Sequence, residues 1–166
     1  SDAPLDAAAA TEAVRVAKEA ADGLLREAEA SRGTKQDCFE LLERAEGAYD
    51  RTIGLDPGRT HSSAAAVHSN RALVRLRLAT MSGVWTAPPK FRACIADCDV
   101  AVGLTPSYIK ALFRRAKAHL ALASAPHATP GSAQQSADLD AALGDLRAIL
   151  AIEADHKEAT RWLHAA

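Results

Sequence analysis

The sequence predicts an all-α fold, and three observations support this prediction. Apolar residues make up 48% of the 166 residues but aromatic residues only 4%, and alanine dominates the apolar set. Alanine is the strongest helix former, whereas strands collect β-branched and aromatic residues. Apolar residues also recur at spacings of three and four along most of the chain, as in amphipathic helices. Segments that contain proline and glycine interrupt this pattern, as expected for connections between helices.

The composition excludes several classes of partner. The formal net charge is −1 at pH 7, so the chain as a whole has no excess of positive charge to attract nucleic acid or an anionic membrane. We therefore expect neither as a partner, and any anion-binding site must come from local clustering. The three cysteines, Cys38, Cys94 and Cys98, form an odd set, which predicts reduced thiols in the cytosol or nucleus. Of these two compartments we expect a cytoplasmic protein.

The length of the chain is enough for one domain, which we expect to cover residues 11–166. Residues 1–10 are rich in alanine and are interrupted by Pro4. We expect these ten residues to form a disordered N-terminal segment or the edge of a piece cut from a longer protein.

The first two predicted helices cover residues 11–32 and about 35–55. Gly33 and Thr34 separate them, and Asp56-Pro57-Gly58 ends the second. Their inward positions at helical spacing are Val14, Ala17, Ala21, Leu24, Leu25 and Ala28, then Phe39, Leu42, Ala45, Tyr49, Thr52 and Ile53. Because the connection is short, we expect the two helices to pack as an antiparallel hairpin.

The third and fourth predicted helices cover about 62–80 and 90–104. Residues 81–89 between them contain one glycine and two prolines and predict a loop, which includes Trp85. The inward positions of these two helices are Ala65, Val67, Ala72, Leu73, Leu76 and Leu78, then Phe91, Cys94, Ile95, Cys98, Ala101 and Val102.

The last three predicted helices cover about 107–124, 137–153 and 155–165. Residues 125–136 contain two prolines and one glycine and predict a mobile connection between the first two of these helices. We expect the short last helix to cap one end of the helical stack.

The chain also repeats. Pro57 and Pro106 follow matching helix ends, and Ala154 occupies the corresponding place after a third. These positions lie 49 and 48 residues apart, longer than the roughly 34-residue period of short helical-hairpin repeats. The connections at 81–89 and 125–136 account for most of the excess. Hairpins that repeat in this way are expected to stack, because no single hairpin can bury its apolar face alone.

Four short motifs resemble a known family. They are Asn70-Arg71-Ala72, Ala96-Asp97-Cys98-Asp99, Pro106-Ser107-Tyr108-Ile109-Lys110-Ala111 and Arg114-Arg115-Ala116. In this order they resemble tetratricopeptide-repeat (TPR) co-chaperones of the carboxylate-clamp type, over about residues 11–165. The resemblance implies an all-α right-handed superhelical solenoid with three stacked TPR hairpins and a capping helix. The implied hairpins lie at about 11–57, 62–106 and 107–154, and the capping helix at 155–165.

The resemblance also implies a peptide-binding site. Members of this family bind the acidic C-terminal peptide of an Hsp70- or Hsp90-type chaperone through charge-assisted hydrogen bonds to its terminal carboxylates. Carried over by position, the peptide-binding residues are Lys18, Asp22, Asn70, Lys110 and Arg114. Asp22 departs from the family pattern, because an asparagine is usual at this position.

The residues themselves support a site at some of these positions. Lys110 and Arg114 lie four residues apart on one predicted helix, so their cationic groups point to the same side. The same spacing is common on solvated helix faces, and this alternative stays open on spacing alone. Asn70 favours a binding role, because asparagine is a poor helix former in the middle of a helix.

Two functions are compatible with these patterns. The first is a protein-interaction adaptor for a chaperone C-terminus. The alternative is a TPR scaffold that holds an internal segment of another protein in its groove or at the Trp85 loop. We expect no enzyme, because no nucleophile and general base can be assembled from the motifs. We also expect no cofactor and no metal, because Cys94 and Cys98 occupy packed positions and the histidines have no ligand spacing.

Overall fold

The computed structural model describes residues 3–126 and 128–165. Within these residues the chain forms seven α-helices and no strand, so the all-α prediction is confirmed. The helices are α1 (Ala3–Ala30), α2 (Lys35–Leu55), α3 (Ala64–Met81), α4 (Ala87–Leu104), α5 (Ile109–Ala123), α6 (Ala133–Ile152) and α7 (Lys157–Ala165). None of the described helices has both the length and the apolar content needed to cross a membrane.

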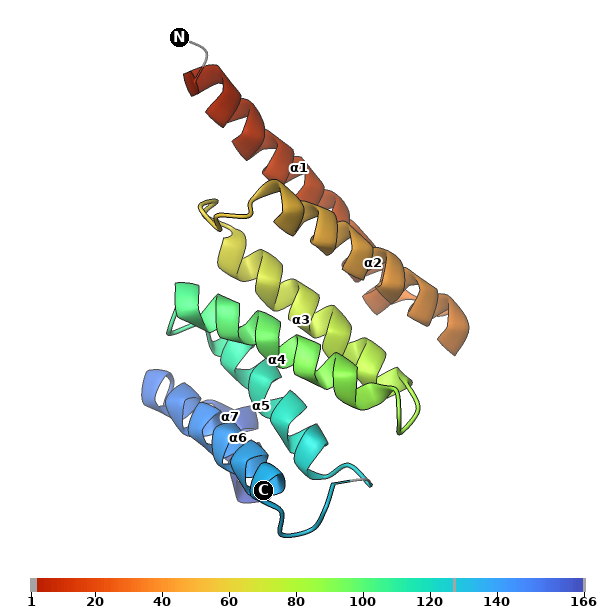
Figure 1. Cartoon of the computed structure of the whole chain (residues 1–166), viewed down its shortest axis with the longest axis vertical. Helices are drawn as coiled ribbons and strands as arrows, with labels where there is room; N and C mark the ends of the chain where they lie inside the picture. Colours follow the sequence, from red (N-terminus) through yellow and green to blue (C-terminus); the bar gives the residue numbers. More distant parts are fainter. Residues whose placement is uncertain (1–2, 127, 166) are drawn as a thin grey trace.

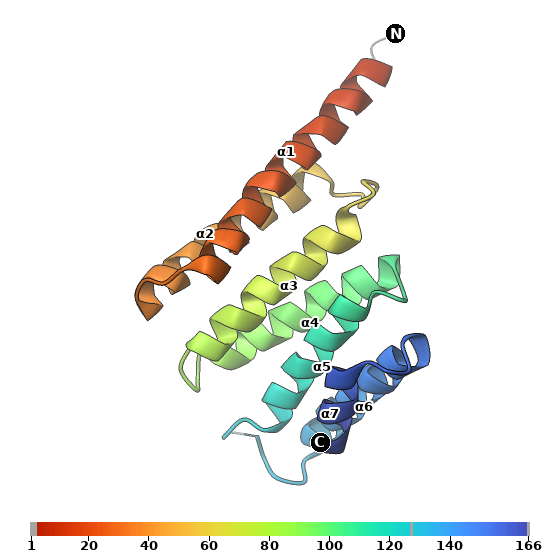
Figure 2. The same cartoon turned by 180° about the vertical axis from the view of Figure 1, so that it is seen from behind.

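Consecutive helices pack as hairpins, α1 with α2, α3 with α4 and α5 with α6, and α7 packs on α6. The hairpins lie side by side in two layers. Figure 1 shows α2, α4 and α6 in front, and we call them the outer layer. Figure 2, seen from behind, shows α1, α3, α5 and α7, which we call the inner layer. Helices that are distant in the sequence therefore share one face of the molecule.

The core consists of three clusters, each of which joins one hairpin to the next inner helix. The first lies between α1, α2 and α3 and includes Leu42 and Tyr49. The second lies between α3, α4 and α5 and includes Cys94 and Cys98. The third lies between α5, α6 and α7 and includes Leu146. Because each cluster involves neighbouring helices, the chain is stabilised as a one-dimensional stack.

Side-chain hydrogen bonds define both ends of α2. At its start, the Thr34 hydroxyl accepts from the backbone N–H of Asp37, and the Asp37 carboxylate accepts from the backbone N–H of Thr34. This reciprocal capping box satisfies backbone donors that have no partner inside the helix. At its end, the Asp56 carboxylate accepts from the backbone N–H groups of Thr60 and His61. These bonds hold the turn that leads into α3.

Residues 3–10 differ from the disorder expected from the sequence. They form the first turns of α1, which extends beyond the body of the molecule in Figures 1 and 2. The high helix propensity of alanine explains this extension, and Pro4 lies in the first turn, where a backbone N–H has no intrahelical acceptor. Residues 6–13 are exposed, so the extension lies outside the core. Residues 1 and 2 lie outside the described residues.

Both predicted connections are shorter than expected. Pro88 and Pro89 lie in the first turn of α4 instead of in a loop, because proline is tolerated there, and the connection is reduced to residues 82–86. Helix α6 begins at Ala133, four residues early, because the Ser132 hydroxyl accepts a backbone N–H of its first turn. Helices α3, α5 and α7 each begin two residues later than expected.

Candidate functional site

The five residues that the sequence analysis singles out all lie on inner-layer helices. Lys18 and Asp22 are on α1, Asn70 is on α3, and Lys110 and Arg114 are on α5. Helix α3 contacts both α1 and α5, so Asn70 lies between the other helices of the site. Polar contacts connect four of the five residues in the order Lys18, Asp22, Asn70, Arg114. Lys110 is not part of this connected set.

Asp22 is the centre of the connected set. Its Oδ2 accepts a hydrogen bond from Lys18 Nζ at 2.5 Å, and its Oδ1 accepts from the Tyr49 hydroxyl at 2.5 Å and from Asn70 Nδ2 at 3.1 Å. Burial acts to raise the pKa of Asp22, but these hydrogen bonds together outweigh it, so its pKa lies below the ordinary value. Asp22 is therefore an ionised carboxylate that side chains from three helices hold in place.

Arg114 is anchored to α3. Its Nη1 donates to the backbone carbonyl and to the hydroxyl of Ser69, both at 2.6 Å, and lies 3.5 Å from Asn70 Oδ1. Burial lowers the pKa of Arg114, but an arginine keeps its charge in a protein. All of these acceptors are neutral, and no described carboxylate forms an ion pair with Arg114. Its positive charge is thus positioned but not neutralised.

Lys110 lies one helical turn before Arg114 on α5. Its side chain is exposed, and over residues 3–126 and 128–165 it forms no hydrogen bond or ion pair. The two residues therefore present two positive charges that no described carboxylate neutralises. A mobile ammonium and a fixed guanidinium are suited to bind a carboxylate together.

Tyr49 is a part of the site that the sequence analysis did not include. It lies on α2, is fully buried, and its hydroxyl reaches Asp22. Burial and the hydrogen bond to Asp22 raise the pKa of Tyr49, so the hydroxyl stays protonated and acts as a donor. The sequence places Tyr49 in a row of packed positions, which explains the omission. The available signal was its hydroxyl, because a buried tyrosine needs a hydrogen-bond partner.

An apolar groove of about 530 Å³ continues from the site along α3 and α5. Leu73 follows Asn70 by three residues on α3, and Lys117 follows Arg114 by three residues on α5, so the groove begins about one helical turn beyond the site. The residues that line the groove are Leu73, Leu76, Arg77, Thr80, Phe91, Lys117, Leu120, Ala121, Ser124 and Trp162.

The capping helix α7 contributes Trp162 to the wall of this groove. The Trp162 ring meets the Phe113 ring edge-on, with the ring centroids 6.3 Å apart. The ammonium of Lys117 lies 4.5 Å from the Phe113 centroid and 5.5 Å from the Trp162 centroid, within the range of cation–π interactions. The groove therefore combines aliphatic and aromatic walls with cationic groups.

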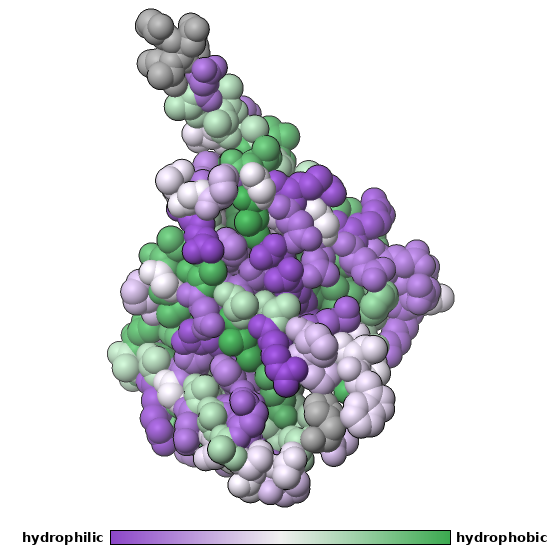
Figure 3. Space-filling view, in the orientation of Figure 1, coloured by the Kyte–Doolittle hydropathy of each residue, from purple (hydrophilic) through white to green (hydrophobic). Residues whose placement is uncertain are grey.

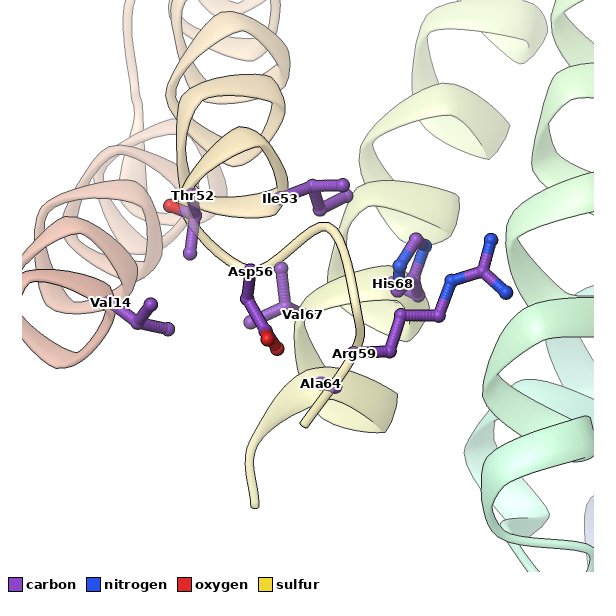
Figure 4. Close-up of a pocket in the computed structure, with 8 residues that line it drawn as sticks. All are labelled: Val14, Thr52, Ile53, Asp56, Arg59, Ala64, Val67 and His68. Atoms are coloured by element: carbon purple, nitrogen blue, oxygen red, sulfur yellow. The ribbon is translucent and has the colours of Figure 1, made fainter. Parts of the chain in front are cut away.

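A separate small cavity lies at the turn between α2 and α3 (Figure 4). It is lined by Val14, Thr52, Ile53, Asp56, Arg59, Ala64, Val67 and His68. Its volume of about 10 Å³ leaves room for one water molecule. Because the Asp56 carboxylate already binds the backbone of the turn, we assign this cavity no ligand.

Two further charged clusters join the helices within hairpins. Asp97 of α4, whose side chain is 3% exposed, accepts hydrogen bonds from Arg71 and Arg75 of α3 at 2.7 to 2.9 Å. Arg115 of α5 forms a similar pair with Asp145 of α6. Figure 3 shows that hydrophilic residues are interspersed with hydrophobic ones over the outer layer. These ion pairs hold neighbouring helices together, and we assign them no catalytic role.

Cys94 and Cys98 are free thiols, fully buried in the second core cluster. Their predicted packed positions are confirmed. Within the described part of the chain, no three His, Cys, Asp or Glu side chains are grouped closely enough to hold a metal ion.

Solved structures share this arrangement of helices. The first TPR domain of Spaghetti (RPAP3), bound to the HSP90 peptide SRMEEVD, matches with a TM-score of 0.59 at 24% identity over 93% of both chains. The fold is that of a TPR domain. The first TPR domain of human RPAP3 matches with a TM-score of 0.58, also at 24% identity, over 92% of this chain and 87% of that one. The prediction of three TPR hairpins followed by a capping helix is confirmed.

At the level of sequence, this chain is similar to part of a mitochondrial import receptor. The import receptor subunit TOM70 of Rattus norvegicus and that of Homo sapiens are each 34% identical to it over 89 residues. The match covers 54% of this chain and 13% of each receptor, so the chain spans a small part of these relatives. No protein-family model matches the chain.

Proposed function

We propose that this TPR domain is a protein-interaction adaptor that binds the acidic C-terminal peptide of an Hsp70- or Hsp90-type chaperone on its inner layer. The observation that supports this most directly is the pair of Lys110 and Arg114, which no described carboxylate neutralises, beside Asn70. The first TPR domain of RPAP3, which has the same fold, is bound to an HSP90 peptide.

The chemistry of the site suits a peptide carboxylate. Lys110 acts as a flexible point charge, and Arg114 presents N–H groups in a direction that Ser69 holds. A guanidinium that is already ordered loses little conformational entropy when a ligand binds. The site can therefore form charge-assisted hydrogen bonds without rearrangement.

The apolar groove suits the residues that precede the peptide terminus. In an extended peptide, a side chain four residues before the last lies roughly 13 Å from it. This is little more than two turns of a helix, and on α3 it leads from Asn70 to the region of Arg77. An apolar side chain there would enter the groove near Arg77. In the peptide bound to RPAP3, a methionine lies four residues before the last aspartate.

Calorimetric titration with two peptides tests this function. The first ends in Met-Glu-Glu-Val-Asp with a free terminus, and in the second both terminal carboxylates are replaced by amides. We expect a micromolar dissociation constant for the first, roughly −7 to −8 kcal/mol, because the ligand is small and the site is already formed. The second should bind at least about tenfold more weakly, since its end has no charge. Equal affinities would contradict the proposal.

The alternative function is a TPR scaffold that binds an internal segment of another protein. Asp22 favours this alternative, because its carboxylate already accepts hydrogen bonds from Lys18 and Asn70 that a peptide carboxylate would otherwise receive. Equal binding of the two peptides, together with binding of a segment that has no free C-terminus, would support the scaffold.

We also propose a finer resemblance and a compartment. Within the TPR proteins, the sequence most resembles tetratricopeptide repeat protein 1. The two features that they share are the long link into the second repeat and Arg75, where an aromatic residue is usual.

We place the adaptor in the cytoplasm, because Cys38, Cys94 and Cys98 are free thiols and such thiols persist in a reducing compartment.

A further inference from the structure

The Asp22 carboxylate already accepts hydrogen bonds that a ligand carboxylate could otherwise receive. Its oxygens accept hydrogen bonds from Lys18, Tyr49 and Asn70, which are the kinds of donor that a site offers to a bound chain end. An ionised carboxylate has about four acceptor positions, and described donors fill three of them. One position on Oδ2 is left, and the Asp22 side chain is 17% exposed.

The charges divide the site into two halves. In the first half, the Asp22 carboxylate and the Lys18 ammonium form an ion pair at 2.5 Å, so their charges cancel. In the second half, Lys110 and Arg114 carry two positive charges that no described carboxylate neutralises. An anionic group of the ligand is therefore attracted to the second half alone.

A ligand end with two carboxylates fits this division less well than a ligand end with one. Asn70 lies between the two halves, 3.5 Å from Arg114 and 3.1 Å from Asp22. When one carboxylate of the ligand pairs with Lys110 and Arg114, the neighbouring carboxylate would therefore lie toward Asp22. Two ionised carboxylates repel, and neither can donate a hydrogen bond to the other. An amide in place of the second carboxylate removes the repulsion and supplies N–H donors for the remaining acceptor position of Asp22.

We infer that the site prefers a chain end with one carboxylate and one amide over a chain end with two carboxylates, and that Asp22 sets this preference. A C-terminal asparagine fits this description, and so does a C-terminal aspartate with an amidated α-carboxyl group. A free C-terminal aspartate binds as well, but less tightly, because its second carboxylate meets the Asp22 carboxylate. The inference rests on the proposed function, because it concerns the same site and the same class of ligand, an acidic peptide.

Four peptides that end in Met-Glu-Glu-Val-Asp or Met-Glu-Glu-Val-Asn, each with a free or an amidated terminus, test the inference. Their affinities are measured by titration calorimetry for the wild-type chain, for Asp22→Asn and for Asp140→Asn. Asp140 is an exposed aspartate on α6 in the outer layer, so its replacement removes the same charge away from the site.

Two of the peptides have one terminal carboxylate: the one that ends in asparagine with a free terminus and the one that ends in aspartate with an amidated terminus. For the wild type and for Asp140→Asn, one of these two should bind at least about threefold more tightly than the peptide with two terminal carboxylates. For Asp22→Asn, the peptide with two terminal carboxylates should bind most tightly, by about tenfold. The order changes because an amide at position 22 can donate where a carboxylate can only accept.

The inference is wrong if the wild-type chain binds the peptide with two terminal carboxylates more tightly than both peptides with one. This comparison uses the wild-type chain alone. For the variant, a melting curve by circular dichroism establishes whether Asp22→Asn is folded. The same order of affinities in the wild type and in a folded Asp22→Asn would also overturn it. A different result would contradict the proposed function. In that case the amidated peptide that ends in asparagine, which has no terminal carboxylate, would bind as tightly as the other three peptides.

Discussion

At Asp22, one carboxylate connects three helices. Its hydrogen-bond partners come from α1, α2 and α3, and Tyr49 and Asn70 lie 27 and 48 residues away in the sequence. Under the proposed function, the same side chain would also change what the site binds, because an ionised carboxylate can only accept hydrogen bonds, whereas the asparagine of the resembled family can also donate. Under the proposed function, stability and specificity are therefore coupled at this one residue.

Lys110→Glu should weaken binding of the acidic peptide without changing the stability of the fold. Binding should lose about 2–4 kcal/mol, because a peptide carboxylate loses a cation and meets an anion. Lys110 is exposed and has no partner among the described residues, so the free energy of unfolding should change by less than about 0.5 kcal/mol. Titration calorimetry measures the first quantity and urea denaturation the second.

Lys35→Glu is the matched control. Lys35 is an exposed lysine at the start of α2 in the outer layer, so the same charge reversal should leave peptide binding unchanged. Arg114 is less suited to this test, because its bonds to Ser69 give it a structural role as well. If Lys110→Glu unfolded at lower urea while it still bound the peptide normally, Lys110 would be structural.

Among the elements, α2, α3 and α4 are joined by one network of ion pairs. Arg71 and Arg75 of α3 both bind the buried carboxylate of Asp97 on α4. Arg71 also binds Asp50, and Arg75 also binds Glu46, both on α2. Helix α3 is thereby connected to the outer-layer helices on both sides.

Asp97→Asn should destabilise the chain by about 3 kcal/mol at neutral pH, because two partly buried guanidinium groups lose a shared carboxylate. Burial acts to raise the pKa of Asp97, but hydrogen bonds from His68 and Arg71 outweigh it, so its pKa lies below the ordinary value. A lower pKa in the folded state means that this stabilisation is present above about pH 4 and is lost as the pH falls through the folded-state pKa.

Urea denaturation of the wild type and of Asp97→Asn, from about pH 7 to about pH 2, measures this effect. The difference between their free energies of unfolding should shrink in acid. Asp99→Asn is the control, since Asp99 is 57% exposed and its pair with Arg115 should contribute less than about 1 kcal/mol. A difference for Asp97→Asn that stayed constant down to acid pH would contradict the assignment.

Over the whole molecule, the three core clusters form a continuous stack that ends at α7. Each cluster is shared by neighbouring helices, so the terminal helix stabilises the cluster beneath it. At the opposite end, the first turns of α1 extend past the stack into solvent (Figure 1). The two ends of the chain should therefore contribute very differently to stability.

Removal of the chain from Lys157 onward should lower the free energy of unfolding by about 3–5 kcal/mol, because the third core cluster loses its cover. The residues that provide this cover are Ala159, Trp162 and Leu163. Removal of residues 3–10 is the control and should change the free energy of unfolding by less than about 1 kcal/mol. Urea denaturation of both truncated chains measures these effects, and equal losses would contradict the role of α7 as a cap.

Local sequence patterns were enough to determine the helices and the pairs of residues that share one helix. Lys18 and Asp22, like Lys110 and Arg114, lie four residues apart, and such pairs meet on one side of any α-helix. The wrong predictions concern helix ends. At residues 3–10 and at Pro88 the sequence contains proline, which is common both in loops and in the first turn of a helix, and a local pattern does not distinguish these two uses.

The tertiary structure alone decided which side chains meet across helices. Asp22 and Asn70 lie 48 residues apart, and Ser69 and Arg114 lie 45 apart, yet each pair is hydrogen-bonded. Such contacts depend on the angle and register at which two helices pack, and no short stretch of sequence contains either quantity. The sequence therefore identified Asp22 as a departure from the pattern of the family that it resembles, but the folded chain decided that its carboxylate is already bound by Lys18, Tyr49 and Asn70.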